Sequence, residues 1–150
     1  MRVVLQRVTE AGVRLPDETP PREAGRIGAG ILVLVGFTGG DGEEALGWMA
    51  AKIADLRIFP GDHGMMEHSL RESGGGLLLV SQFTLYADIR KGRRPDFTAA
   101  APYAEAERLF GRFREACEAE LPGRVASGVF GARMEIILVN DGPVTLVIDR

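Results

Sequence analysis

The sequence predicts a mixed α/β fold, and three observations lead to that prediction. Short apolar runs bounded by glycine or proline recur along the chain, as is typical of buried strands. Two longer segments, one after Asp41 and one after Pro102, carry apolar residues at helical spacing. The chain has 150 residues, 45% hydrophobic and 26% charged, which suits one globular domain over residues 1–150.

Most of the expected strands are apolar runs that end at glycine, proline or charged residues. They cover residues 2–8, 12–15, 31–37, 77–83, 133–139 and 144–148. The segment 16–23, rich in proline and acidic residues, predicts an exposed turn.

Each of the two expected helices has a start signal, an apolar face and a stop signal. Asp41 followed by Glu44 resembles a capping box with aspartate in place of serine or threonine, and Pro102 suits the first position of a helix. The apolar faces are Leu46, Met49, Ile53 and Leu56 in the first helix, and Ala106, Leu109, Phe110, Phe113 and Cys117 in the second. Proline and glycine at 60–61 and 121–123 predict where the helices end.

Two segments of the chain are similar to each other. Residues 28–38 read GAGILVLVGFT and residues 74–84 read GGGLLLVSQFT, so that each has glycines, an apolar strand and then Phe-Thr. Chance similarity of two buried strands is one explanation. The other is a pair of strand-plus-helix units, which agrees with a mixed α/β fold.

Composition excludes several classes of function. Eighteen basic and 21 acidic residues give a net charge of −3, which is not the footprint of a nonspecific nucleic-acid binder, although a local basic patch can still contact phosphate. The single cysteine excludes an intramolecular disulfide and a multi-cysteine zinc site. No apolar leader follows Met1 and no run is long enough for a membrane helix, so we expect a cytoplasmic protein without a membrane partner.

The common side-chain catalysts are missing from the sequence. Cys117 lies on the apolar face of the second expected helix and reads as a buried structural thiol. His63 and His68 have no obvious third ligand, so no metal is expected, and nothing predicts a cofactor. Ser81 is not in a nucleophile-elbow context, so a Ser-His-Asp triad has little support. An enzymatic function has to work without these groups.

Three polar segments are candidates for a site, each with an ordinary alternative. Residues 81–84 end an apolar strand, where freed backbone N–H groups can face a developing oxyanion, or where the strand simply emerges into solvent. Residues 90–94 hold four cations, which suit either a solvated loop or a phosphate contact. Residues 140–143, Asn-Asp-Gly-Pro, fit a hairpin turn; if the Gly-Pro bond is cis, they also fit a rigid pair of carbonyl acceptors.

The motifs taken together resemble one family. They are VLQRV at 4–8, ILVLVG at 31–36, RIF at 57–59, SQFTLYA at 81–87, GRRPDF at 92–97, FGARM at 130–134 and NDGPVT at 140–145. The chain resembles the D-aminoacyl-tRNA deacylases, and the match runs nearly from end to end. The combination of SQFT with NDGPVT is highly specific.

The resemblance implies a fold, a reaction and partners. The fold would be a single domain of layered, partly barrel-like β-sheets with two main amphipathic helices, assembled as a homodimer. The enzyme would hydrolyse the carboxylic ester between a D-amino acid, or glycine, and the terminal adenosine of tRNA. The implied partners are therefore tRNA and a second copy of the chain, while DNA is not expected.

The resemblance also implies roles for individual residues. Backbone N–H groups of Gln82, Phe83 and Thr84 would stabilise the oxyanion, and the Thr84 hydroxyl is a candidate nucleophile without a visible base. Gly142 and Pro143, joined by a cis bond, would reach into the partner's pocket and reject L-amino acids. The other implied roles are substrate contact for Ser81, Ala100, Phe130 and Met134, support of the Gly-Pro tip for Arg7 and Asn140, and tRNA phosphate contact for Arg90, Lys91, Arg93 and Arg94.

Two other interpretations stay open. A non-catalytic dimeric module that binds nucleic acid would not require both SQFT and NDGP. A general esterase for small esters would need a nucleophile with a base, and the sequence shows none.

Overall fold

The computed structural model describes residues 1–150 and confirms the mixed α/β class. The strands are β1 (Arg2–Leu15), β2 (Arg22–Ile27), β3 (Gly30–Gly36), β4 (Arg57–Phe59), β5 (His68–Ser69), β6 (Gly76–Ser81), β7 (Val125–Ser127) and β8 (Glu135–Asp149). The helices are α1 (Glu43–Asp55), α2 (Leu70–Ser73) and α3 (Tyr103–Glu120), with a short 3-10 helix η1 (Phe83–Tyr86). None of the helices has the length and apolar character needed to cross a membrane.

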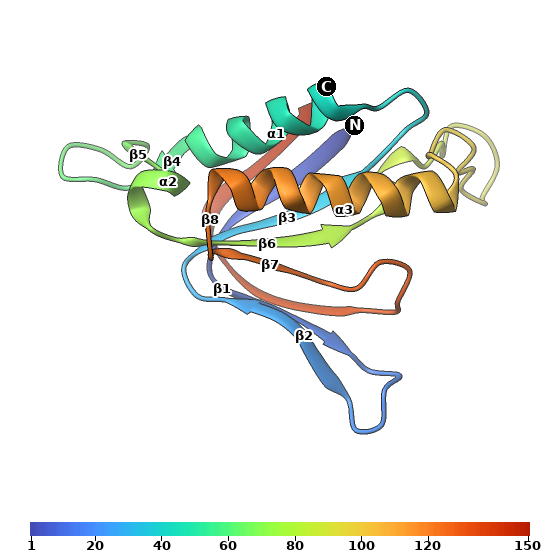
Figure 1. Ribbon diagram of the computed structural model, residues 1–150, viewed down its shortest axis with the longest axis horizontal. Helices are drawn as coiled ribbons and strands as arrows, with labels where there is room; N and C mark the ends of the chain where they lie inside the picture. The colour runs from blue at the N-terminus through green and yellow to red at the C-terminus, as the bar shows by residue number, and fades with distance from the viewer.

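A curved sheet built around the long strand β1 forms the frame of the molecule (Figure 1). The strand order is β2-β1-β3-β6-β7, and β8 pairs with the other edge of β1. Residues 2–8 of β1 pair with β3 and residues 11–15 pair with β2. β2 also lies close to β7. A Cβ atom added to Gly25 in β2 would come within 2.8 Å of the carbonyl oxygen of Ser127 in β7. The sheet is therefore partly barrel-like, as the resemblance implied.

Two predictions at the start of the chain need correction. Residues 2–8 and 12–15 form one strand rather than two, because the ladder with β8 continues through the polar residue Glu10. The turn predicted at 16–23 ends earlier, since Arg22 already belongs to β2. The sequence does not predict β2, whose residues REAGRI contain no apolar run.

The two similar segments are neighbouring strands. β3 and β6 pair in parallel, with Gly30 opposite Gly76 and Val33 opposite Leu79. This is the register of the ungapped sequence alignment, so the similarity corresponds to two paired strands joined by a crossover that includes α1. β6 ends at Ser81, earlier than predicted, because the chain turns into η1 at Phe83.

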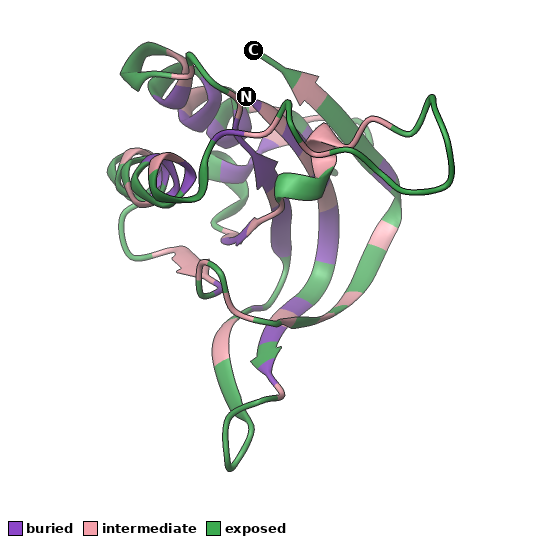
Figure 2. Cartoon of the chain, turned by 90° about the vertical axis from the view of Figure 1, so that its right-hand side faces the viewer, coloured by how far each residue is buried: buried purple, intermediate pink, exposed green.

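The two long helices cover one face of the sheet and bury the predicted apolar faces (Figures 1 and 2). All five predicted face residues of α3 are buried, and so are Leu46, Met49 and Ile53 of α1. Leu56 follows the end of α1 and is only half-buried. Pro102 is the N-cap of α3 rather than its first residue. The resulting core fills the space between the helices and the sheet, and a smaller apolar cluster lies where β1, β2 and β6 curve together.

The capping box predicted at Asp41 is wrong. Gly42 is the N-cap of α1, and the Asp41 carboxylate accepts a hydrogen bond from the Thr38 N–H at 2.8 Å and pairs with the N-terminal amine at 2.5 Å. A capping box occurs instead at Ser69 and Glu72, at the start of α2. The hydrogen bonds from Ser69 lower the pKa of Glu72 to about 2.

The last two predicted strands form one long strand, β8, so the hairpin interpretation of residues 140–143 is wrong. Gln6 pairs with Thr145 while Val8 pairs with Asn140, which leaves several residues of β8 opposite Arg7 alone. Both halves of β8 run antiparallel to β1, so the chain does not reverse. Residues 141–144 therefore form a large bulge in a continuing strand. We call these residues the Gly-Pro bulge.

Candidate functional site

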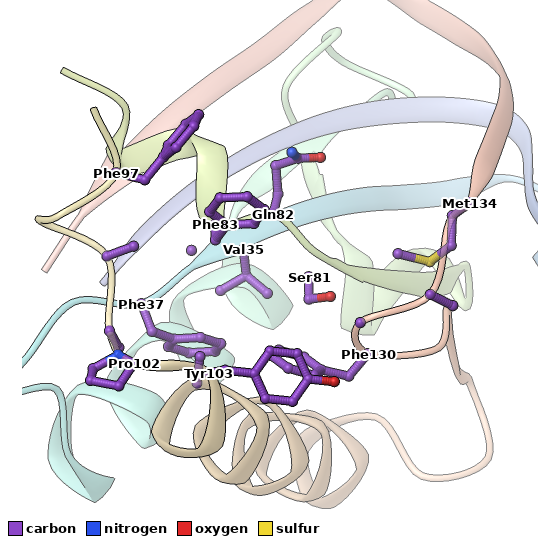
Figure 3. A pocket seen from close by; sticks show the side chains of 16 residues that line it. Val35, Phe37, Ser81, Gln82, Phe83, Phe97, Pro102, Tyr103, Phe130 and Met134 are labelled. Atoms are coloured by element: carbon purple, nitrogen blue, oxygen red, sulfur yellow. The ribbon is translucent and has the colours of Figure 1, made fainter. Parts of the chain in front are cut away.

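A cavity of about 610 Å³ lies where β3 and β6 end, beside the start of α3 (Figure 3). Eleven of its 16 lining residues are hydrophobic. The lining consists of Val35, Gly36, Phe37, Ser81, Gln82, Phe83, Phe97, Ala100, Ala101, Pro102, Tyr103, Ala106, Phe130, Gly131, Ala132 and Met134. Its volume falls in the range of small-molecule sites, and its position at strand ends is one where α/β proteins build such sites.

The structure brings together all four residues that the sequence predicts for substrate contact. Ser81, Ala100, Phe130 and Met134 all line the cavity, from β6, the segment before α3 and the segment before β8. In Figure 3 the Ser81 and Met134 side chains lie on the sheet side of the cavity and Phe130 lies near α3. Thr84 is not part of the lining, and neither Gly142 nor Pro143 reaches this cavity from its own chain.

The end of β6 presents main-chain donors next to the cavity. The Gln82 N–H donates to the Val35 carbonyl oxygen at 2.7 Å, so this donor is already used by the sheet. The prediction of three backbone donors is therefore wrong for Gln82. Phe83 and Thr84 begin η1, and the first N–H groups of a helix have no partner within the helix. The N–H groups of Phe83 and Thr84 thus have no partner within the helix, and their role toward an oxyanion stays a prediction.

Side-chain chemistry around these donors is sparse. The Gln82 side-chain amide donates to the Thr84 hydroxyl oxygen, and no carboxylate or histidine bonds that hydroxyl. The Ser81 side chain likewise makes no hydrogen bond to a base. The arrangement offers polarised N–H groups, but no activated nucleophile.

Aromatic rings form much of the cavity wall, and the sequence pattern does not predict several of them. Tyr103 and Phe130 make an edge-to-face pair with ring centroids 5.1 Å apart, and Phe83 and Phe97 make another at 5.0 Å. Phe37 follows β3 as Phe83 follows β6, so the internal similarity already indicated its place. The sequence does not indicate that Tyr103 lines a cavity. Tyr103 is the first residue of α3, and helix starts have no preference for tyrosine.

The Gly-Pro bulge is held by the two residues predicted to support it. The Arg7 side chain is 98% buried; its Nε lies 2.8 Å from Asp141 Oδ2 and 3.2 Å from the Asp141 carbonyl oxygen, and its Nη1 donates to the Ile58 carbonyl oxygen. The Asn140 amide donates to the Arg7 carbonyl oxygen at 3.1 Å and to that of Val144 at 3.3 Å. The Gly142–Pro143 peptide bond is cis, and both residues are exposed.

The basic loop at 90–94 is exposed and projects from the cavity end of the molecule (Figure 1). Its base is closed by two backbone hydrogen bonds between Asp88 and Asp96, at 2.7 and 3.0 Å. Arg90 pairs with Asp88 at 2.6 Å, which lowers the pKa of the Asp88 carboxyl. Lys91, Arg93 and Arg94 form no ion pair. Three of the four cations of this loop are therefore free for an external anion.

The remaining reactive residues lie away from the cavity. Burial raises the pKa of the Cys117 thiol to about 12, so it is protonated at neutral pH and packs as a core residue, as predicted. His68 lies in β5 and His63 in the loop before it. No three histidine, cysteine, aspartate or glutamate side chains are grouped as potential metal ligands.

These features define a class of protein: a small α/β protein with an apolar ligand cavity at strand ends and main-chain donors beside it. Comparison with known families then gives the identity. The chain belongs to the D-Tyr-tRNA(Tyr) deacylase family, whose model matches residues 4–149.

Individual relatives agree with this assignment. The chain is 56% identical to a D-aminoacyl-tRNA deacylase of Nitratidesulfovibrio vulgaris strain DP4, over 99% of this chain and 93% of the relative. It is 53% identical to a D-aminoacyl-tRNA deacylase of Stenotrophomonas maltophilia strain K279a, over 99% of both chains. Among solved structures, a c-Myc DNA Unwinding Element Binding Protein matches with a TM-score of 0.91 and 37% identity, over 100% of this chain and 99% of that one. A probable eukaryotic D-amino acid tRNA deacylase shares the fold, with a TM-score of 0.84 and 21% identity, over 99% and 98% of the chains.

Proposed function

We propose that the protein hydrolyses the ester bond of D-aminoacyl-tRNA. The observation that carries the proposal is the cavity at the end of β6, where the family segments SQF and FGARM meet beside free main-chain donors. Its apolar wall suits an aminoacyl group and a purine base, and its volume of about 610 Å³ leaves room for both.

The reaction needs little beyond what these residues offer. A water oxygen attacks the ester carbonyl carbon, the bond from that carbon to the ribose oxygen breaks, and a proton from the water passes to the ribose oxygen. The products are a free D-amino acid and tRNA. The N–H groups of Phe83 and Thr84 stabilise the developing oxyanion, and the 2′-hydroxyl of the substrate ribose orients the water. Because an aminoacyl ester is already activated, no nucleophile–base pair is required.

Substrate contacts follow from the cavity wall. Phe130, Met134 and Ala100 lie against the adenosine or the amino acid, and Ser81 shapes the pocket floor. An aromatic ring beside an unstacked base is a common device in the recognition of single-stranded RNA ends. The edge-to-face pair of Tyr103 and Phe130 provides such a ring here.

Chirality is selected, in this proposal, by the Gly-Pro bulge of a second copy of the chain. The tip of the bulge, Gly142 and Pro143, is exposed; the bulge is held by Arg7 and Asn140 and does not reach the cavity of its own chain. In a homodimer its carbonyl oxygens screen the substrate's α-carbon in the partner's cavity. An L-side chain is rejected there, whereas a D-side chain or the hydrogen of glycine fits.

Discharge assays test the proposed substrates. Purified protein should release amino acid from both D-tyrosyl-tRNA and glycyl-tRNA, and sedimentation should show a dimer at the same concentration. Release from D-tyrosyl-tRNA alone would contradict glycine as a substrate. A monomer with full chiral selectivity would contradict the cross-subunit screen.

The free cations of the basic loop predict a salt-dependent contact with tRNA phosphates. Replacing Arg93 and Arg94 by alanine should weaken tRNA binding and reduce the slope of log K against log salt concentration by about 0.7 to 0.9 for each lost phosphate contact. The control is Arg90→Ala, because Arg90 is already paired with Asp88 and should change the slope less. Filter binding over a range of salt concentrations measures both slopes. Equal slopes for the wild type and the double variant would show that the loop is only solvated.

A non-catalytic nucleic-acid-binding module is the second candidate function. It is favoured by the name of one structural relative, which refers to binding a DNA unwinding element. The two candidates differ in one result: a binding module would bind tRNA or DNA without releasing amino acid from D-tyrosyl-tRNA.

A further inference from the structure

The segment between the basic loop and α3 forms one wall of the cavity. Its lining residues are Phe97, Ala100, Ala101, Pro102 and Tyr103. Two hydrogen bonds fasten this wall to the end of β3. The Thr38 hydroxyl donates to the Ala99 carbonyl oxygen at 2.7 Å, and the Ala101 N–H donates to the Phe37 carbonyl oxygen at 2.9 Å.

Thr38 is itself held in place by a second hydrogen bond, which its backbone N–H makes with Asp41. Its N–H donates to Asp41 Oδ2 at 2.8 Å, and Asp41 Oδ1 holds the N-terminal amine at 2.5 Å. The strand register puts Thr38 after β3 where Thr84 stands after β6. The Phe-Thr pair therefore occurs at the end of both strands. Phe83-Thr84 lies at the main-chain donors after β6, and Phe37-Thr38 fastens the cavity wall after β3.

We propose that Thr38 is a positioning residue that sets the place of the wall against which the aminoacyl-adenosine is seated. Thr38 does not line the cavity, so it acts through the backbone of Ala99, which lies two residues before the Ala101 N–H that bonds Phe37. The inference rests on the proposed function and extends it to a residue outside the cavity.

Removing the hydroxyl while keeping the side-chain shape tests the proposal. A Thr38→Val variant should raise KM for D-tyrosyl-tRNA about 3- to 10-fold, the range expected for one lost hydrogen bond. Its kcat should be nearly unchanged, because the wall touches the substrate in the ground state and the transition state alike. Thr38→Ser keeps the hydroxyl and should restore the KM of the wild type.

Thr98→Val is the matched control. Thr98 lies in the same segment but does not line the cavity, and its hydroxyl donates only to Asp96 at the base of the basic loop, at 2.5 Å. This variant should keep the KM of the wild type. An equal rise in KM in both valine variants would overturn the proposal, because any lost hydroxyl near the wall would then have the same effect.

Amide hydrogen exchange of Ala101 separates this inference from the proposed function, since it needs no substrate. Exchange at Ala101 should be faster in Thr38→Val than in the wild type and unchanged in Thr98→Val. Unchanged exchange in Thr38→Val would overturn the positioning role even in an active deacylase. A wild-type protein that leaves D-tyrosyl-tRNA intact would instead overturn the proposed function, and with it the role of Thr38 toward this substrate.

Discussion

A Phe83→Pro variant is expected to hydrolyse D-tyrosyl-tRNA about 100-fold more slowly than the wild type, the usual effect of removing one oxyanion donor. Phe83 is the first residue of η1, a position that tolerates proline because the N–H there has no partner within the helix. The preceding residue, Gln82, has a φ of −146°, outside the helical region that proline disfavours before it. The substitution therefore removes a donor with little change to the backbone. Single-turnover rates with saturating enzyme measure the effect.

Two further variants separate the loss of the Phe83 N–H from the loss of the Phe83 ring and of the Thr84 hydroxyl. Phe83→Ala keeps the N–H and loses the ring, which lines the cavity and packs on Phe97, so with saturating enzyme its rate should fall far less than that of Phe83→Pro. Thr84→Ala should also retain most of the rate, since the hydroxyl contacts only Gln82 and no base. Full activity in Phe83→Pro would contradict the main-chain mechanism. A slow Thr84→Ala beside an active Phe83→Ala would point to the Thr84 hydroxyl as the nucleophile.

An Arg7→Met variant should lose both stability and chiral selectivity. Methionine has a similar length but no charge, so the buried Ile58 carbonyl oxygen loses its donor and Asp141 is released. We expect the free energy of unfolding to fall by about 2 kcal/mol. The loosened Gly-Pro bulge should let L-tyrosyl-tRNA react about tenfold faster, which corresponds to about 1.4 kcal/mol of lost discrimination. Urea unfolding and discharge of L-tyrosyl-tRNA measure the two effects.

Arg14→Met is the matched control for that variant. Arg14 also lies in β1 and pairs with a residue of β8, but its side chain is 52% exposed and lies 3.9 Å from Glu135. Such surface pairs contribute about 0.5 kcal/mol or less. An Arg7→Met protein that is destabilised but still spares L-tyrosyl-tRNA would show that the bulge does not select chirality.

The sequence was sufficient where local pattern and burial agree. The apolar faces of α1 and α3 follow from spacing alone, and the shared glycines of the two similar segments anticipate the register of β3 with β6. The four residues predicted for substrate contact all line the cavity, and three of them, Ser81, Phe130 and Met134, belong to the local motifs SQFT and FGARM.

The sequence was insufficient where a distant partner decides the structure. Asp41 has the features of a helix cap, but its carboxylate forms an ion pair with the N-terminal amine and accepts a hydrogen bond from the Thr38 N–H instead. Residues 140–143 have the composition of a turn, yet β1 pairs on both sides of them and keeps β8 continuous. The Gln82 N–H belongs to the sheet because Val35 lies beside it in the fold. Apart from Thr38, which lies three residues before Asp41, these partners are all far away in the sequence.

The most direct test of the proposed function compares the two mirror-image substrates. Purified protein is mixed, with a chelator present, with D-tyrosyl-tRNA or with L-tyrosyl-tRNA, and the remaining ester is followed with time. We predict rapid loss of the D-ester and persistence of the L-ester. Equal loss of both would contradict chiral selection by the Gly-Pro bulge, and persistence of both would contradict the deacylase function itself.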